Sequence, residues 1–219
     1  MNIQVVERIL GANDILAQEI REQLLSDGVT TFNIIGTPGA GKTSLIERTL
    51  LGLKDQISTA VIEGDIATSI DADRLAALGI PVVQINTGGE CHLDAGMVKS
   101  ALSKLDMPSI ELLLIENVGN LVCPAEFDLG ESKKVLIASV TEGDDKPRKY
   151  PLMYRLTDAV VINKLDLAPH VPFDLQAFKR SVSEINPNAP IFEVSCTTGE
   201  NINQWTAWLL AQTKVDKAN

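Results

Sequence analysis

One run of eight residues constrains the fold of this chain more than any other, Gly36-Thr-Pro-Gly-Ala-Gly-Lys42-Thr43. It matches the phosphate-loop pattern G-x-x-x-x-G-K-[ST] at every fixed position. Backbone N–H groups of such a loop surround phosphate oxygens, and the helix that follows points the positive end of its dipole at them. The run follows an apolar segment at 31–35 and opens a helical pattern over 43–54. The sequence therefore predicts a strand–loop–helix unit that binds a nucleotide.

The residues of this loop have separate expected roles. Lys42 is expected to reach the β- and γ-phosphates, and the Thr43 hydroxyl is expected to bind Mg²⁺. The other nucleotide-binding residues expected here are Gly36, Thr37, Pro38, Gly39, Ala40, Gly41 and Ser44. An ordinary glycine turn is the alternative, and the position of the full motif between a strand and a helix argues against it.

Apolar runs and helical patterns alternate along the rest of the chain. We expect strands at 31–35, 58–62, 82–85, 111–115, 134–140, 159–162 and 191–194, and helices at 43–54, 70–78, 93–105, 174–184 and 201–213. This alternation is typical of a mostly parallel sheet with helices on both faces. We therefore predict an α/β fold of the three-layer P-loop NTPase kind, with one domain over residues 1–219.

The two ends of the chain and one internal segment give weaker signals. Apolar residues at mostly helical spacing over 2–26, with Gly28 as a stop, predict that residues 1–28 form an N-terminal helical extension. Gly11 and Asn13-Asp14 are the places where it would divide into two helices. The polar stretch Gly143–Lys149 predicts a surface loop, and the last six residues a solvated tail.

Charge and cysteine content exclude several classes of function. The net charge of −10 and the pI near 4.7 argue against nucleic acid or an anionic membrane as a partner. The N-terminus shows no secretory pattern, and no apolar run approaches the length of a membrane span. Three widely spaced cysteines do not predict a disulfide framework. We expect a reduced chain in the cytoplasm.

A second motif indicates which base is bound. Asn163-Lys164-Leu-Asp166 follows the apolar run at 159–162, at the end of an expected strand. A carboxylate there can accept hydrogen bonds from N1–H and the 2-amino group of guanine, which adenine does not offer. Ser195-Cys196 follows the last expected strand and is expected to support the base. Cys196 is interpreted as a loop residue and not as a metal ligand.

A third motif has the position of a GTPase switch. Glu116-Asn-Val-Gly119 follows the apolar run at 111–115. The Gly119 N–H is expected to sense the γ-phosphate, and the acid to help order Mg²⁺. Asp65 is a second magnesium candidate that is also placed to orient the attacking water. The predicted catalytic residues are Lys42, Asp65, Glu116 and Gly119. The alternative for either acid is a solvated strand end. No water-positioning glutamine or arginine finger is evident, so we expect slow intrinsic hydrolysis.

The remaining candidates are Cys91, His92 and Cys123. Thiolate and imidazole ligands suit Ni²⁺ or Zn²⁺, but three ligands rarely close a four-coordinate site within one chain. Two copies related by a two-fold axis would supply six. The alternative is a cysteine packed as a small apolar residue and an unrelated histidine, and spacing alone favours it.

Several motifs together resemble the hydrogenase nickel-incorporation GTPases, the HypB family. The resemblance runs from about residue 30 to 213. It is carried by the phosphate loop, Glu90-Cys-His-Leu-Asp-Ala95, Glu116-Asn-Val-Gly-Asn-Leu-Val-Cys-Pro124, Ser139-Val-Thr-Glu-Gly-Asp-Asp-Lys-Pro147 and Asn163–Asp166. It implies a nickel-inserting GTPase that forms a GTP-dependent homodimer, with a Ni²⁺ or Zn²⁺ site at Cys91, His92 and Cys123 near the dimer interface. It further implies a nickel-binding co-chaperone and a hydrogenase large-subunit precursor as partners.

The sequence also departs from many members of that family. It has neither an N-terminal cysteine motif nor a histidine-rich stretch, so we expect transient metal holding at a switch-linked site and no storage. Three alternatives stay open at this point. They are a nickel-accessory GTPase for urease or carbon monoxide dehydrogenase, a zinc-stabilised GTP-binding scaffold, and a small-molecule kinase, which N-K-x-D disfavours.

Overall fold

The computed structural model describes residues 3–66 and 69–216. Its centre is a seven-stranded sheet in the order β3-β2-β4-β1-β5-β6-β7, in which every neighbouring pair is parallel. The strands are β1 (Thr30–Gly36), β2 (Thr59–Asp65), β3 (Val82–Asn86), β4 (Leu112–Glu116), β5 (Lys133–Ser139), β6 (Ala159–Asn163) and β7 (Ile191–Glu193). Strands buried on both faces, such as β4 and β6, explain the continuous apolar runs in the sequence.

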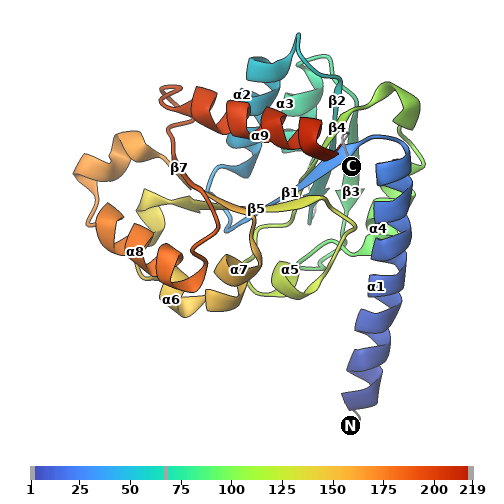
Figure 1. Cartoon of the computed structure of the whole chain (residues 1–219), viewed down its shortest axis with the longest axis horizontal. Coiled ribbons are helices and arrows are strands. Elements are labelled where there is room, and N and C mark those ends of the chain that lie inside the picture. The colour runs from blue at the N-terminus through green and yellow to red at the C-terminus, as the bar shows by residue number, and fades with distance from the viewer. Residues whose placement is uncertain (1–2, 67–68, 217–219) are drawn as a thin grey trace.

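Helices cover both faces of this sheet, so the predicted α/β fold is confirmed (Figure 1). The helices are α1 (Ile3–Ser26), α2 (Lys42–Leu53), α3 (Ile70–Ala76), α4 (Ala95–Leu102), α5 (Cys123–Glu126), α6 (Lys146–Lys149), α7 (Pro151–Leu156), α8 (Leu175–Ile185) and α9 (Ile202–Asp216), with 3-10 turns at Met107–Ser109, Val140–Glu142 and Leu165–His170. Within the described residues, no helix is long and apolar enough to cross a membrane.

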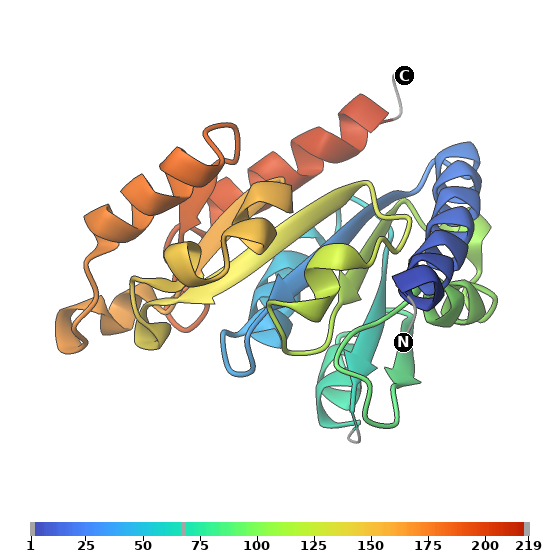
Figure 2. The same cartoon turned by 90° about the horizontal axis from the view of Figure 1, so that it is seen from below.

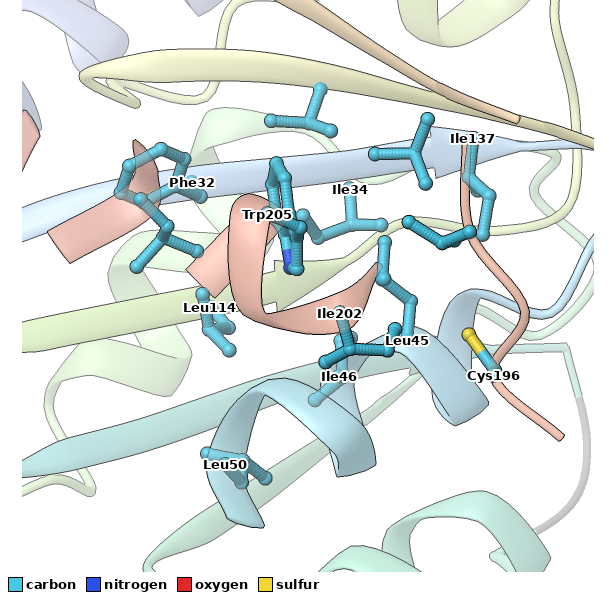
Figure 3. Packing of buried hydrophobic residues seen from close by; sticks show 14 of the residues in the cluster. Phe32, Ile34, Leu45, Ile46, Leu50, Leu114, Ile137, Cys196, Ile202 and Trp205 are labelled. Atoms are coloured by element: carbon cyan, nitrogen blue, oxygen red, sulfur yellow. The ribbon is translucent and has the colours of Figure 1, made fainter. Parts of the chain in front are cut away.

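The core on one face lies between the sheet and helices α2 and α9. Figure 3 shows Trp205 of α9, Ile46 of α2 and Ile34 of β1 in this cluster. Trp205 is almost fully buried, and its indole Nε1 donates a hydrogen bond of 2.8 Å to Oγ1 of Thr49. Because α2 follows the phosphate loop directly, this packing fixes the loop against the centre of the sheet.

On the opposite face, α1 and α4 pack side by side over one half of the sheet, and α7 and α8 over the other (Figures 1 and 2). The predicted division of the N-terminal helix at Gly11 and Asn13-Asp14 is wrong, because α1 is one helix from Ile3 to Ser26. A helical glycine costs only about 1 kcal/mol. The Asn13 side chain bonds to other segments, so it does not compete for the backbone of its own helix.

Other boundaries also differ from the sequence-based expectations. The expected surface loop at 143–149 contains α6, because Pro147 fits the first turn of a helix and is buried. The helix expected to start at residue 93 begins at Ala95, where Asp94 accepts a hydrogen bond from Met97 N. At the C-terminus, α9 extends to Asp216, so part of the expected tail is helical; residues 217–219 lie outside the described residues.

Candidate functional site

The carboxyl ends of β1, β2 and β4 surround a pocket of about 540 Å³. It is lined by all four residues predicted to be catalytic, Lys42, Asp65, Glu116 and Gly119. Pro38, Gly39, Gly41, Thr43 and Ser44 of the phosphate loop line it as well. The structure therefore brings together residues that the sequence separates by up to 126 positions, from Pro38 to Lys164. Ligands of open parallel sheets bind at this end of the strands.

The phosphate loop has the backbone shape that its glycines permit. Gly41 has a φ of 99°, and a Cβ atom there would lie 2.4 Å from the Asn163 side-chain nitrogen. The same Asn163 nitrogen donates a hydrogen bond of 3.0 Å to the Ala40 carbonyl. The loop is thus held by the N-K-x-D segment, and a side chain at position 41 would push the two apart.

Thr43 and Glu116 meet inside this pocket. The Thr43 hydroxyl donates a hydrogen bond of 2.8 Å to one carboxylate oxygen of Glu116, whose side chain is buried. Lys42 is buried beside them, and its Nζ lies 3.4 Å from the carbonyl oxygens of Gly36 and Thr37. Burial lowers the pKa of Lys42, although the nearby Glu116 opposes that shift.

A second buried acid, Glu63, lies across from Glu116 on the neighbouring strand. Burial raises the pKa of Glu63 to about 8, and the nearby charge of Glu116 adds to this shift. Burial also raises the pKa of Glu116 to about 7, although the positive charge of Lys42 opposes that shift. Among the described residues, one oxygen of each carboxylate has no hydrogen-bond partner. Two buried oxygens of this kind beside a threonine hydroxyl fit a hydrated Mg²⁺, which prefers oxygen ligands.

The sequence analysis missed Glu63, although a signal was present. Glu63 and Asp65 are two positions apart on β2, so their side chains lie on the same face of the strand. Asp71 and Arg74 of α3 also line the pocket, and no motif marked them. Arg74 forms an ion pair with Glu47 and lies 3.4 Å from Oγ of Ser44.

A neighbouring pocket of about 600 Å³ lies on the other side of the phosphate loop. Its lining includes Ser44, Asn163, Lys164 and Cys196 of the predicted nucleotide-binding residues. Asn163 Oδ1 accepts a hydrogen bond of 3.1 Å from Cys196 N, and Lys164 Nζ donates one of 2.6 Å to the Gly39 carbonyl. The N-K-x-D segment therefore joins the phosphate loop to the loop after β7.

Asp166 and Ser195 contact each other beside this second pocket. The Ser195 hydroxyl donates a hydrogen bond of 2.5 Å to Asp166 Oδ1, and the side chain of Ser195 is fully buried. Ser195 is thus placed to orient the Asp166 carboxylate. Arg48 of α2, which the sequence analysis did not single out, donates hydrogen bonds to the carbonyls of Cys196 and Thr197.

Cys196 is a buried loop residue remote from the other cysteines. Its sulfur lies in the core under α2 (Figure 3), and burial raises the pKa of the thiol to about 11. Thr37 also differs from its neighbours in the loop, because its hydroxyl donates a hydrogen bond to Glu142. Gly36, Thr37 and Ala40 are not among the residues that line the two pockets.

The three predicted metal ligands form one cluster. The ligand atoms of Cys91, His92 and Cys123 lie within 4.8 Å of one another. The two thiol sulfurs are 2.9 Å apart, and the sulfur of Cys91 is 3.6 Å from His92 Nδ1. The hydrogen bond between the thiols raises the pKa of Cys91. Free thiols and an imidazole at this separation can bind a soft or borderline divalent metal ion.

Local structure explains how these ligands meet. Cys123 is the first residue of α5, a short helix after Glu116–Gly119 that the sequence does not predict. Cys91 and His92 precede α4, and Leu93 separates them from the Asp94 cap of that helix. The His92 ring packs against Phe127, with centroids 3.9 Å apart. The cluster is exposed at Cys91 and half-buried at the other two ligands, so an ion can enter from solvent.

The sequence was compared with known families and proteins. The model of the CobW/HypB/UreG nucleotide-binding domain matches residues 30–193. The hydrogenase maturation factor HypB of Azotobacter vinelandii is 49% identical over 210 residues, which are 96% of this chain and 69% of that protein.

Two crystal structures have the same fold. The hydrogenase maturation factor HypB of Archaeoglobus fulgidus has 42% identity and a TM-score of 0.87, with 93% of this chain and 99% of that chain covered. HypB of Helicobacter pylori in complex with nickel has 38% identity and a TM-score of 0.89, with 94% and 97% covered. The resemblance inferred from the motifs is therefore confirmed: the chain belongs to the HypB family of hydrogenase maturation factors.

Proposed function

We propose that this chain binds and hydrolyses GTP and couples that cycle to nickel delivery during maturation of a [NiFe]-hydrogenase. The observation that carries the proposal is the position of the metal cluster. Cys123 lies seven residues after Glu116, on the segment that continues from the wall of the phosphate pocket. A change at Glu116–Gly119 on hydrolysis would therefore move one metal ligand relative to the other two.

For GTP hydrolysis, the proposed roles follow from the pocket geometry. Lys42 binds the β- and γ-phosphates, and Gly119 N–H contacts the γ-phosphate. Thr43, Glu116 and Asp65 hold Mg²⁺, whose charge offsets that of the phosphates. Asp65 orients the attacking water. The pocket wall is rich in carboxylates, and its arginine, Arg74, is paired with an acid, which supports a slow intrinsic rate.

For base selection, the proposed reader is the Asp166 carboxylate, which Ser195 orients. Guanine offers the two N–H donors that an ionised carboxylate accepts, so GTP is the preferred nucleotide. Asn163 and Lys164 act on the phosphate loop, to which both are bonded.

For the metal, we propose that Cys91, His92 and Cys123 hold nickel in transit, with Zn²⁺ as a competitor. Three ligands leave a four-coordinate ion incomplete, so a second copy or a partner completes the site. A GTP-dependent homodimer would supply the further ligands. Metal binding requires both thiols to stay reduced, which supports work in the cytoplasm.

The likeness to hydrogenase maturation factors, one of them solved in complex with nickel, supports the choice of metal and target. We propose a hydrogenase large-subunit precursor as the recipient and a nickel-binding co-chaperone as a further partner. Residues 1–219 would act as one GTPase domain to which the extension 1–28 belongs.

Nickel transfer tests this proposal directly. The chain is loaded with one equivalent of radioactive Ni²⁺ and mixed with nickel-free hydrogenase precursor and Mg²⁺, together with GTP, GDP or a non-hydrolysable GTP analogue. We expect fast transfer with GTP and slow transfer in the other two mixtures. Cys123→Ser should reduce loading, whereas Cys196→Ser, the matched control, should not. Equal transfer rates in all three mixtures would refute the coupling.

A further inference from the structure

Asn117, the second residue of the Glu116–Gly119 segment, connects the phosphate pocket to the metal loop through its side chain. It lines the phosphate pocket, yet its residue surface is only 1% exposed. Its Oδ1 accepts a hydrogen bond of 3.1 Å from the backbone N–H of Leu93, the residue after His92. It also accepts one of 2.9 Å from Val118 N. One buried amide oxygen thus bonds to both segments.

The other end of this amide is anchored in the sheet. Asn117 Nδ2 donates a hydrogen bond of 3.2 Å to Oδ1 of Asn33 on β1, and Asn33 Nδ2 donates one of 3.1 Å to the Glu131 carboxylate. All three side chains are buried. Buried polar groups are costly to leave unpaired, so this chain of bonds permits few positions of the Asn117 side chain.

Asn120, one residue beyond Gly119, forms a second connection between the phosphate loop and the metal loop. Its backbone pairs with Gly36, the first residue of the phosphate loop, in an isolated antiparallel bridge. Its side-chain Nδ2 donates a hydrogen bond of 3.3 Å to the carbonyl of Cys91, and its Oδ1 accepts one of 3.0 Å from Val122 N. Asn120 therefore contacts the phosphate loop, a metal ligand and the residue before Cys123.

We propose that Asn117 and Asn120 are positioning residues that transmit the nucleotide state to the metal ligands. When Glu116–Gly119 shifts with the γ-phosphate, the two amides carry the Cys91–Leu93 backbone with them. Cys91 and His92 follow through these side-chain amides, whereas Cys123 follows through the backbone. The two groups of ligands therefore move by different amounts, and the nickel affinity changes because the separations between the ligands change. The proposal rests on the coupling stated above and names the side chains that carry it.

The test measures nickel affinity in two nucleotide states. For each protein, the dissociation constant of Ni²⁺ is measured with GDP and with a non-hydrolysable GTP analogue, and the ratio of the two is the coupling. The variants are Asn120→Ala, which removes a half-buried side chain, and Asn117→Ala. The control is Asn188→Ala, an exposed asparagine in the turn before β7. Couplings between sites commonly lie at about 5- to 150-fold.

We expect the ratio to move at least about threefold towards 1 in both variants, a shift comparable to the lower end of ordinary couplings. In Asn120→Ala, whose side chain does not line the phosphate pocket, nucleotide affinity and nickel stoichiometry should stay close to those of the parent chain. A general loss of structure would instead lower both nickel affinities by the same factor. Asn120→Ala decides the question if Asn117→Ala does not fold.

Two results would contradict the proposal, and they differ in what else they overturn. If the ratio in the parent chain differs from 1 and Asn120→Ala leaves it unchanged, the role of the amides is refuted but the coupling is not. A parent ratio of 1 would refute the coupling of nucleotide and metal as well. Amide hydrogen exchange at Leu93 adds a second measurement, since its rate should differ between the two nucleotide states in the parent chain and converge in the variants.

Discussion

Replacing Gly119 with alanine should weaken the binding of a GTP analogue more than the binding of GDP. A Cβ atom built at Gly119 would lie 2.8 Å from Pro38 Cγ, 2.9 Å from Pro38 N and 3.1 Å from Pro38 Cα. Two of these atoms belong to the backbone of the phosphate loop, so they cannot turn aside as a flexible side chain would. The Glu116–Gly119 segment must therefore withdraw from the loop to accommodate the methyl group.

The magnitude follows from the cost of that contact. Inserting one methyl group into a packed position costs about 1–3 kcal/mol, and each 1.4 kcal/mol corresponds to about a factor of ten in an equilibrium constant. If Gly119 must approach the loop only when a γ-phosphate is bound, the full cost falls on the GTP state. The affinity for a GTP analogue should then fall roughly 5- to 150-fold.

Fluorescence titration with labelled GDP and a labelled GTP analogue would measure this difference. Gly11→Ala is the matched control, because a Cβ there meets no atom within 4 Å. That control should leave both affinities unchanged and raise the free energy of unfolding by about 1 kcal/mol, the usual gain from glycine to alanine within a helix. Equal weakening of GDP and analogue by Gly119→Ala, or no weakening of either, would refute the reasoning.

Three further predictions concern the base, the buried acids and the first helix. Asp166→Asn should lower GTP affinity about 100-fold or more in the same titration, because the new amide would place its own N–H group against the N–H donors of guanine. Unchanged affinity would contradict the role assigned to Asp166. With raised pKa values, Glu63 and Glu116 keep protons that the unfolded chain releases, so nucleotide-free stability should fall as pH rises from about 5 to 8. Chemical denaturation across this range should show that the free energy of unfolding falls less steeply with pH in Glu63→Gln than in the parent chain. An unchanged slope would count against the raised pKa of Glu63. Asn13→Ala should reduce the free energy of unfolding by about 1–3 kcal/mol, because it leaves two backbone groups without their side-chain partner; a loss near zero would show that water replaces it.

Much of the fold could be predicted because strand and helix patterns are local. The apolar runs at β4 and β6 are continuous, as expected for strands that are buried on both faces. The phosphate loop and N-K-x-D each carry their chemistry in adjacent residues, so their placement followed from the strands before them. Short helices such as α5 and α6 were missed, because four residues are too few to show a period.

The parts that could not be predicted depend on contacts between distant segments. In α1, the Asn13 side chain bonds to the start of α4 and to the Asp128 carbonyl, and neither partner is near it in the sequence. The cysteine cluster is similar, since spacing alone favoured unrelated residues for Cys91 and Cys123. Cys91 follows β3 and Cys123 follows β4, and only β2 lies between these two strands in the sheet, an order that no local pattern specifies.

The central claim is that one chain links its nucleotide state to its metal affinity. The most direct test measures Ni²⁺ and Zn²⁺ binding by the pure protein with GDP and with a non-hydrolysable GTP analogue, alongside its mass in solution. We expect metal affinity or stoichiometry to change between the two nucleotides, and the change to accompany dimer formation. Identical metal binding in both states, with or without a dimer, would contradict it.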